Sequence, residues 1–257
     1  MSVDRIPASV AIIACNEEAR IAKCLESVRN FDEVVIVIDA RTTDSTADIA
    51  QKYGCRIYFE HWKGFGPQKQ SALDKCKNQW VMVMDSDEVL SPEAALEAAY
   101  VLQDKEPAAQ AYSFPRKNFL HGKWLKHGDF WPDRQIRLVK KDNGRFQSLV
   151  HEKWVMKGGK IENLSGVIEH RSFGGYKDML NTLDRYSTMI AEDLYSKGKR
   201  TNALAPAAHA LWMFVRVYFL KKGFLDGFDG LASSVLKAGG SFFKYAKLLE
   251  LQNRRDF

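Results

Sequence analysis

The chain has 257 residues, of which 46% are hydrophobic, and this is enough for one sizeable core with a smaller unit attached. Its formal net charge is +6, but residues 197–257 carry eleven Lys and Arg against four Asp and Glu, so the excess lies in this basic tail. The four cysteines form no C-x-x-C pair and the start, M-S-V-D-R-I-P, lacks the apolar core of a signal peptide, which argues against a disulfide scaffold and predicts a cytoplasmic location.

Short apolar runs alternate with helical patterns through the first third of the chain. Strands are predicted at 9–15, 33–38, 55–59 and 80–84, helices at 19–28, 47–53 and 68–77, and a loop at 64–67. This alternation predicts an α/β fold with a right-handed, doubly wound, mainly parallel sheet. The sequence contains neither G-x-G-x-x-G nor the Walker lysine loop, so phosphate binding by those two motifs is excluded.

The fourth predicted strand, W-V-M-V-M at 80–84, runs directly into the carboxylates of Asp85, Asp87 and Glu88. An uninterrupted apolar run is typical of a strand buried on both faces, and open α/β sheets bind ligands at the carboxyl ends of such strands. Closely spaced acids repel one another unless a cation is present, and oxygen ligands favour Mg²⁺ or Mn²⁺. We interpret the Asp-x-Asp as a site for a divalent cation on a diphosphate. A solvated acidic turn is the alternative.

Three further residues are candidates for the same chemistry. Asp39 ends the second predicted strand, where a carboxylate can accept a hydrogen bond from a base or a ribose; a turn-forming Asp is the alternative. Inverting sugar transfer needs a general base on the face opposite the leaving diphosphate, and Glu152 is the candidate. His170 is a candidate metal ligand, although a lone histidine is more often structural.

The C-terminal part of the chain is predicted to be helical. Residues 204–220 form the most apolar stretch, which is too short for a clean membrane span and is interrupted by His209 and Arg216. Residues 232–251 combine aromatic residues with lysines, a composition that suits a helix in the headgroup region of a membrane. Packing of both helices on the catalytic domain is the alternative. We predict a domain at 1–195 and a basic, aromatic-rich helical extension at 196–257.

Taken together, these motifs resemble the inverting, GT-A-fold glycosyltransferases of family 2. Within that family, the chain resembles the bacterial lipopolysaccharide inner-core β-1,4-glucosyltransferases that act on heptose. The resemblance covers nearly the whole length and rests on the order and spacing of short segments rather than on any one motif. These segments are I-I-A-C-N-E-E at 12–18, residues 39–46, G-F-G-P-Q-K-Q-S-A-L at 64–73, M-D-S-D-E-V-L at 84–90, residues 131–138, V-H-E at 150–152, residues 168–170 and G-F-L-D-G-F-D-G at 223–230.

The resemblance implies a role for each matching residue. Asp39 would contact the uracil base, and Asp85 the ribose or the water shell of the metal. Asp87 would be the direct ligand of Mg²⁺ or Mn²⁺, His170 a metal or diphosphate contact, and Glu152 the catalytic base. The other implied contacts with the nucleotide sugar come from Asn16, Glu18, Gln68, Lys69 and Arg137. The sequence departs from the family pattern at Ala40-Arg41 and at Gln70, where the family has small residues and an asparagine.

The activity implied by the resemblance is the metal-dependent transfer of a hexose, expected to be glucose from UDP-glucose, to the heptose inner core of a lipopolysaccharide precursor. The expected partners are a UDP-sugar donor, a glycolipid acceptor and the cytoplasmic face of the inner membrane, with no nucleic acid. A polyprenyl-phosphate or polysaccharide acceptor is the alternative. A nucleotidyltransferase is less favoured, because C-N-E-E at 15–18 is acidic where a triphosphate loop is basic. A nucleic-acid-binding module would leave the acidic residues without a role.

Overall fold

The computed structural model describes residues 5–104, 107, 109–147 and 153–253. Its contacts divide the chain into two compact units, the first formed by Met1–Arg116 and Asp133–His170 and the second by Lys117–Pro132 and Arg171–Phe257. A domain boundary after residue 195 was predicted from the sequence. The contacts instead group helix α5 (Tyr176–Ser196) with the C-terminal helices, because α5 packs along α7 (Gly227–Asn253).

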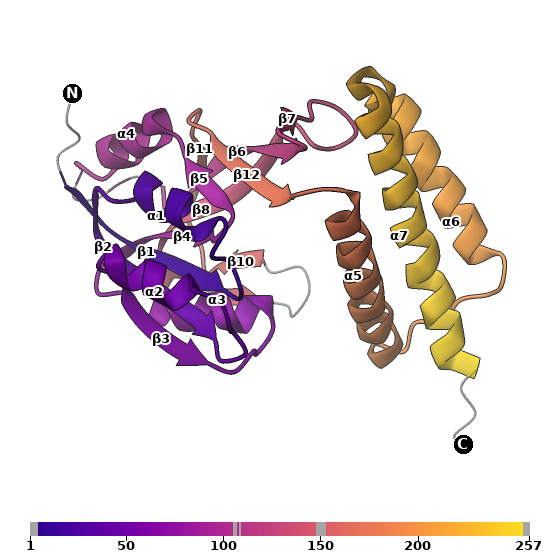
Figure 1. Ribbon diagram of the computed structural model, residues 1–257, viewed down its shortest axis with the longest axis horizontal. Helices are drawn as coiled ribbons and strands as arrows, with labels where there is room; N and C mark the ends of the chain where they lie inside the picture. The colour runs from indigo at the N-terminus through magenta and orange to yellow at the C-terminus, as the bar shows by residue number, and fades with distance from the viewer. Residues whose placement is uncertain (1–4, 105–106, 108, 148–152, 254–257) are drawn as a thin grey trace. The chain divides into compact units, whose positions relative to one another are not determined.

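The first unit is built on a sheet whose first four strands are parallel and follow the order β3–β2–β1–β4 (Figure 1). These strands are β1 (Ile6–Ala14), β2 (Phe31–Asp39), β3 (Arg56–Glu60) and β4 (Trp80–Asp85). The central strand β1 pairs on both sides, so that Ile12 lies opposite Ile36 of β2 and Met84 of β4. A strand with neighbours on both sides and layers on both faces needs an apolar residue at almost every position, which explains the uninterrupted runs.

Beyond β4 the sheet continues in the order β8–β6–β12–β5, with antiparallel pairing of β4 with β8, of β8 with β6 and of β12 with β5. These strands are β5 (Glu88–Leu90), β6 (Ala111–Leu120), β8 (Asp133–Lys140) and β12 (Ile168–Phe173); β7 (Lys123–Trp124) and β11 (Ile161–Asn163) pair with β6. A separate antiparallel pair is formed by β9 (Gly144–Gln147) and β10 (Lys153–Met156), with a 3₁₀ turn at Lys141–Asn143 before it. The predicted α/β class, with doubly wound parallel strands, is confirmed.

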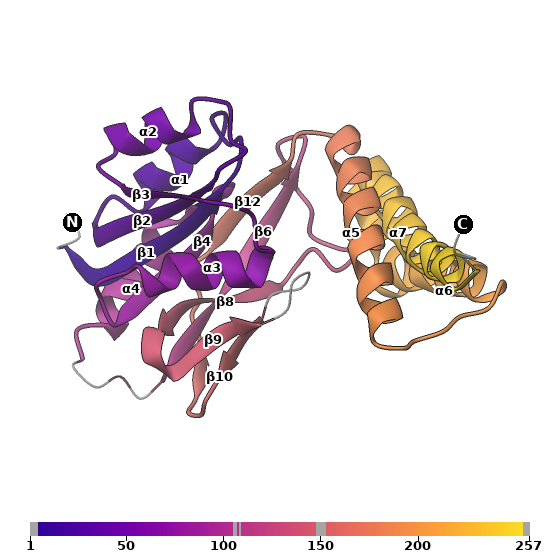
Figure 2. The same ribbon diagram turned by 90° about the horizontal axis from the view of Figure 1, so that it is seen from below.

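Helices cover both faces of the sheet (Figure 2). Helices α1 (Ile21–Ser27), α2 (Thr46–Lys52) and α4 (Pro92–Val101) contribute to one buried cluster, and α3 (Phe65–Asp74) with β9 and β10 to the other. Neighbouring residues of one strand alternate between the clusters: Ile12 and Met84 belong to the first, Ile13 and Val83 to the second. This alternation follows from the pleat of a β-strand.

Helix α3 begins at Phe65, earlier than the predicted start at residue 68. Gly64 precedes it with φ 95°, a left-handed conformation that glycine adopts without a steric penalty. Pro67 then lies in the first turn, where the missing N–H would have no intrahelical partner anyway. Glycine and proline together predicted a loop, but here they mark the start of a helix.

The second unit contains the C-terminal helices, and the predicted helical extension is confirmed. Helix α6 (Ala205–Phe214) continues as a π-helical segment, η2 (Val215–Leu220), and a 3₁₀ turn, η3 (Gly223–Asp226), leads into α7. Helix α7 packs against both α5 and α6 (Figure 1). None of the helices in the described residues is both long enough and apolar enough to cross a membrane.

Candidate functional site

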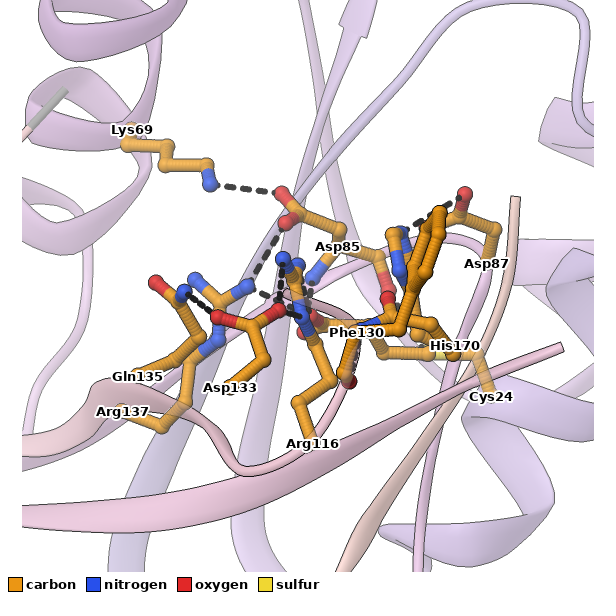
Figure 3. Close-up of polar contacts among 12 residues, drawn as sticks. Cys24, Lys69, Asp85, Asp87, Arg116, Phe130, Asp133, Gln135, Arg137 and His170 are labelled. Carbon is orange, nitrogen blue, oxygen red and sulfur yellow. Dashed lines mark hydrogen bonds and ion pairs between the residues drawn. The ribbon is translucent and has the colours of Figure 1, made fainter. Parts of the chain in front are cut away.

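The carboxylate of Asp85, at the C-terminal end of β4, lies between two buried cations (Figure 3). Its Oδ1 is 2.7 Å from Nζ of Lys69 on α3, and its Oδ2 accepts a hydrogen bond of 2.8 Å from Nη2 of Arg137 on β8. Burial alone would raise the pKa of Asp85, but the charges of Lys69 and Arg137 outweigh it and hold that pKa well below its ordinary value. Asp85 is therefore an ionised carboxylate at neutral pH.

Glu88, on β5, extends this cluster. It is fully buried and accepts hydrogen bonds from the backbone N–H of Asp85 at 3.1 Å, from Arg116 at 3.2 Å and from Arg137. Arg116 also donates to Asp133, at 2.7 and 2.9 Å. Glu88 was predicted only as one of three neighbouring acids, and Arg116 and Asp133 were not singled out as site residues. Arg116 and Asp133 become neighbours only through the register of β6 with β8, so no local sequence pattern could predict their contact.

Asp87 and His170, the two predicted metal ligands, face each other. The antiparallel pairing of β12 with β5 places His170 opposite Glu88, and its Nε2 lies 3.4 Å from Oδ2 of Asp87. Nη1 of Arg20 lies 4.0 Å from the same oxygen. Burial would raise the pKa of Asp87, but the facing His170 outweighs it and lowers that pKa. Asp87 is therefore an ionised carboxylate at neutral pH.

This pair fits a divalent cation that is shared with a substrate. Within the described residues no group of three or more His, Cys, Asp and Glu side chains forms a complete protein cage. Mg²⁺ usually keeps several waters and is held by one or two carboxylates together with substrate phosphates. One carboxylate and one imidazole, with diphosphate oxygens and water completing the shell, satisfy that requirement.

Asp39 lies at the end of β2, as predicted, and its side chain is buried. Its carboxylate accepts the backbone N–H of Arg41 at 3.0 Å and also binds the guanidinium group of Arg41, which is largely exposed. These hydrogen bonds from Arg41 keep the pKa of Asp39 below its ordinary value. The departure from the family pattern at residue 41 therefore supplies the partner of this carboxylate.

Asn16 and Glu18 connect the loops that follow β1 and β2. Oδ1 of Asn16 accepts the backbone N–H of Thr43 at 2.9 Å, and Oε2 of Glu18 accepts that of Ser45 at 3.0 Å. Asn16 has φ 53°, a left-handed conformation that asparagine tolerates better than most residues. Both side chains thus link these two loops by hydrogen bonds. Contact with a nucleotide sugar remains a prediction for them.

Two polar groups beside these loops have unusual surroundings. Gln68 is buried; its Oε1 accepts the N–H of Lys63 at 3.2 Å, while its Nε2 has no hydrogen-bond partner in the described part of the chain. A buried donor without a partner is available to a ligand. The pKa of Glu17 is raised to about 7, mainly by burial and further by repulsion from Asp87, against the lowering effect of Arg20.

The structure thus brings Lys69, Asp85 and Arg137 together in one cluster and Asp87 and His170 in an adjacent pair. Glu152, the predicted base, and the neighbouring His151 lie outside the described residues. The role of Glu152 therefore stays a prediction.

Comparisons with known proteins identify the family of the chain. The model of glycosyl transferase family 2 matches residues 9–164. An uncharacterized glycosyltransferase of Rickettsia typhi is 34% identical over 254 residues, covering 95% of this chain and 87% of its own. The lipopolysaccharide core biosynthesis glycosyltransferase LpsC of Rhizobium meliloti is 29% identical over 255 residues, covering 96% of this chain and 94% of its own.

A solved structure with a similar fold is glucosyl-3-phosphoglycerate synthase from Mycobacterium tuberculosis in complex with Mn²⁺, UDP and phosphoglyceric acid. Its TM-score is 0.49 at 17% sequence identity, and the match covers 77% of this chain and 80% of that one. The family model spans more than half of the chain, and the Rickettsia relative matches almost all of it. The chain therefore belongs to glycosyl transferase family 2 and is a glycosyltransferase.

Proposed function

We propose that this enzyme transfers a hexose, expected to be glucose from UDP-glucose, to heptose in the inner core of a lipopolysaccharide precursor. The observation that carries the proposal is the pair of carboxylates after β4: Asp85 is kept ionised by buried cations, and Asp87 faces His170. The name of the relative LpsC, a lipopolysaccharide core biosynthesis glycosyltransferase, supports this class of acceptor.

Each residue of the proposed site has its own role in inverting transfer. Asp87 and His170 would hold the divalent cation, which when bound supplies positive charge to the diphosphate leaving group. Asp39 would accept a hydrogen bond from uracil in exchange for part of its contact with Arg41. The unpaired Nε2 of Gln68 would donate to the donor. Asp39 and His170 lie on strands, Gln68 on a helix and Asp87 in the short turn between β4 and β5, so the donor would meet side chains held by well-defined backbone.

Glu152 is proposed as the general base. It would take the proton of the acceptor hydroxyl as the new bond to the anomeric carbon forms, and the bond from that carbon to the diphosphate would break on the opposite face. The proton then resides on Glu152 and UDP leaves. Glu152→Gln is expected to keep UDP binding and to lose transfer; normal turnover in this variant would overturn the assignment.

Calorimetric titration of UDP, with and without Mn²⁺, tests the donor site. We expect Mn²⁺ to tighten binding by about tenfold or more in the wild type, and Asp87→Ala to lose that gain. Asp48→Ala, which removes an exposed carboxylate from α2, is the matched control and should behave like the wild type. Equal binding with and without Mn²⁺ would contradict metal dependence, and failure of the wild type to bind UDP would overturn the nucleotide-sugar donor.

Transfer assays distinguish the acceptors. UDP-glucose is offered with a heptose-containing core glycolipid, with polyprenyl phosphate or with a polysaccharide, and the products are identified by mass spectrometry. Glucosylated heptose supports the proposal, whereas transfer to polyprenyl phosphate or polysaccharide alone favours the alternatives. A glycolipid acceptor also requires a membrane, and the basic residues 197–257 suit the anionic cytoplasmic surface of the inner membrane.

A further inference from the structure

The segment from Phe219 to Phe228, which joins η2 to α7, presents apolar side chains to solvent. It lies at the turn between α6 and α7, at the top of Figure 1, and is called the 219–228 tip here. Its large apolar side chains are between 45% and 71% exposed: Phe219, Leu220, Phe224, Leu225 and Phe228. Exposed apolar groups concentrated in so few residues indicate a surface that another partner covers.

The tip buries its acidic side chain, Asp226, and exposes its large apolar ones. Asp226 is buried: its Oδ2 accepts the backbone N–H groups of Lys126 at 3.0 Å and His127 at 2.8 Å, and its Oδ1 lies 2.9 Å from Nδ1 of His127. The carbonyl oxygen of Asp226 accepts a hydrogen bond of 2.9 Å from Nζ of Lys123. These bonds fix the centre of the tip and determine which side chains face outward.

Close glycine contacts hold the tip at both ends. A Cβ at Gly230 would lie 1.9 Å from the carbonyl oxygen of Gly223, and a Cβ at Gly223 would lie 2.8 Å from that of Val217. The N–H of Gly128 donates to the carbonyl of Lys221 at 2.9 Å. These contacts fix the backbone of the tip in the conformation that exposes its phenylalanines.

The outward charge of the tip is positive. Lys221 and Lys222 are exposed between the apolar residues, while Asp226 is buried. Asp129 is shared by two cations, Arg216 at 2.7 Å and Lys221 at 3.6 Å, so the single carboxylate leaves the charge around the tip positive. In a two-fold dimer through this tip, the same lysines would meet across the axis and repel each other. A bilayer with anionic lipids instead satisfies both features, because apolar side chains enter the acyl boundary and lysines meet the headgroups.

An apolar pocket adjoins the tip. It has a volume of about 340 Å³ and is lined by Tyr176, Phe228, Leu231, Ala232, Val235 and Leu236. Phe228 belongs to both the tip and the pocket, so apolar surface is continuous from one to the other. This continuity favours a hydrocarbon environment over a polar partner.

We propose that the 219–228 tip is the membrane-inserting element of this enzyme and docks on a bilayer that contains anionic lipids. The proposal deepens the proposed function, since it rests on an acceptor that lies in a membrane. It also differs from the expectation drawn from the sequence, which placed the membrane contact along residues 232–251.

Flotation of the full chain with vesicles tests this proposal. The vesicles contain either phosphatidylcholine alone or phosphatidylcholine with phosphatidylglycerol. We expect the wild type to bind the anionic vesicles, and the double variant Phe224→Ser with Leu225→Ser to reduce the partition coefficient by about tenfold or more. Matched controls are Phe59→Ser and Tyr100→Ser, because these side chains of the first unit are 63% and 74% exposed and should not matter. Lys221→Glu with Lys222→Glu should weaken binding to anionic vesicles specifically.

Thermal denaturation of each variant shows that it is folded, and binding of UDP with Mn²⁺ separates this proposal from the proposed function. Vesicle binding that depends on the tip supports the inference even if UDP does not bind. Vesicle binding that the tip variants leave unchanged overturns it, whatever the enzyme transfers. A wild type that ignores vesicles also overturns it; if sedimentation then shows a dimer that the tip variants dissociate, the partner is a second copy.

Discussion

Lys69 is a fully buried lysine whose charge is used inside the first unit. Its side chain is only 1% exposed, and its ammonium group lies 2.7 Å from Asp85. A buried lysine without an anionic partner tends to lose its proton, and a buried carboxylate without a cation tends to gain one. Lys69 therefore contributes to the lowered pKa of Asp85. Because Arg137 takes the second oxygen of Asp85, this carboxylate is largely occupied, and Asp87 is the better candidate for direct metal ligation.

Replacing Lys69 tests this contribution. Lys69→Met leaves Asp85 buried with one cation fewer, and we expect a loss of about 3 kcal/mol in the free energy of unfolding, measured by urea denaturation. Lys52→Met, at an exposed position at the end of α2, should change stability by less than about 0.5 kcal/mol. Equal effects of the two substitutions would show that the Lys69–Asp85 pair is not important for stability.

The raised pKa of Glu17 makes the stability of the folded chain depend on pH. Its pKa is about 7 in the folded chain against an ordinary value of 4.5, so the folded state holds this proton more tightly than the unfolded state. The corresponding stability is fully present below about pH 4.5 and is lost as the pH rises through about 7. The Glu17→Gln variant has no carboxyl group at this position, so its stability does not decrease in this way as the pH rises. In metal-free protein, the stability of Glu17→Gln relative to the wild type should therefore increase from about pH 5 to about pH 8.

Urea denaturation at both pH values measures this difference, and Glu26→Gln on α1 is the control. Glu26 is 53% exposed, so its substitution should shift stability equally at the two pH values. A difference between Glu17→Gln and wild type that does not change with pH would contradict the raised pKa of Glu17.

The strands that the sequence predicted well are those whose environment is uniform along their length. β1, β2 and β4 are buried on both faces, and their apolar runs identify them without knowledge of their partners. The antiparallel strands could not be ordered in this way, because pairing depends on residues distant in sequence. Arg116 meets Asp133 only through the register of β6 with β8, and no strand was predicted at Glu88–Leu90, where the structure has β5.

Two glycines of helix α7 differ in the space available for a Cβ, which allows a matched test. A Cβ at Gly230 would lie 1.9 Å from the carbonyl oxygen of Gly223, whereas a Cβ at Gly240 would lie 3.6 Å from Cγ of Leu183, an ordinary contact. Gly230→Ala should lower the free energy of unfolding by about 2 kcal/mol or more, because backbone atoms must move. Gly240→Ala should raise it by up to about 1 kcal/mol through helix propensity. Thermal denaturation compares the two, and destabilisation by Gly240→Ala alone would reverse this assignment.

The two units of the molecule carry different features. The first unit carries the charged cluster around Asp85 and the Asp87–His170 pair, and the second carries most of the exposed large apolar side chains. The charge of the tail was visible in the sequence and pointed to an anionic surface. Which apolar residues face outward was not visible, because it depends on the buried Asp226 and the glycine contacts at Gly223.

Because the donor site and the membrane-docking tip lie in different units, we expect their variants to respond differently to an acceptor in a membrane and to an acceptor in solution. With a core glycolipid embedded in anionic vesicles, both Asp87→Ala and the double variant Phe224→Ser with Leu225→Ser should reduce the initial rate of transfer by about tenfold or more. With the water-soluble core oligosaccharide as acceptor, Asp87→Ala should remain impaired because donor binding is lost. The tip variant should then match the wild type, because no membrane has to be reached. A tip variant that is equally slow with both acceptors would place its defect in the chemistry rather than in membrane docking, and a tip variant that is normal with both would remove the link between docking and transfer.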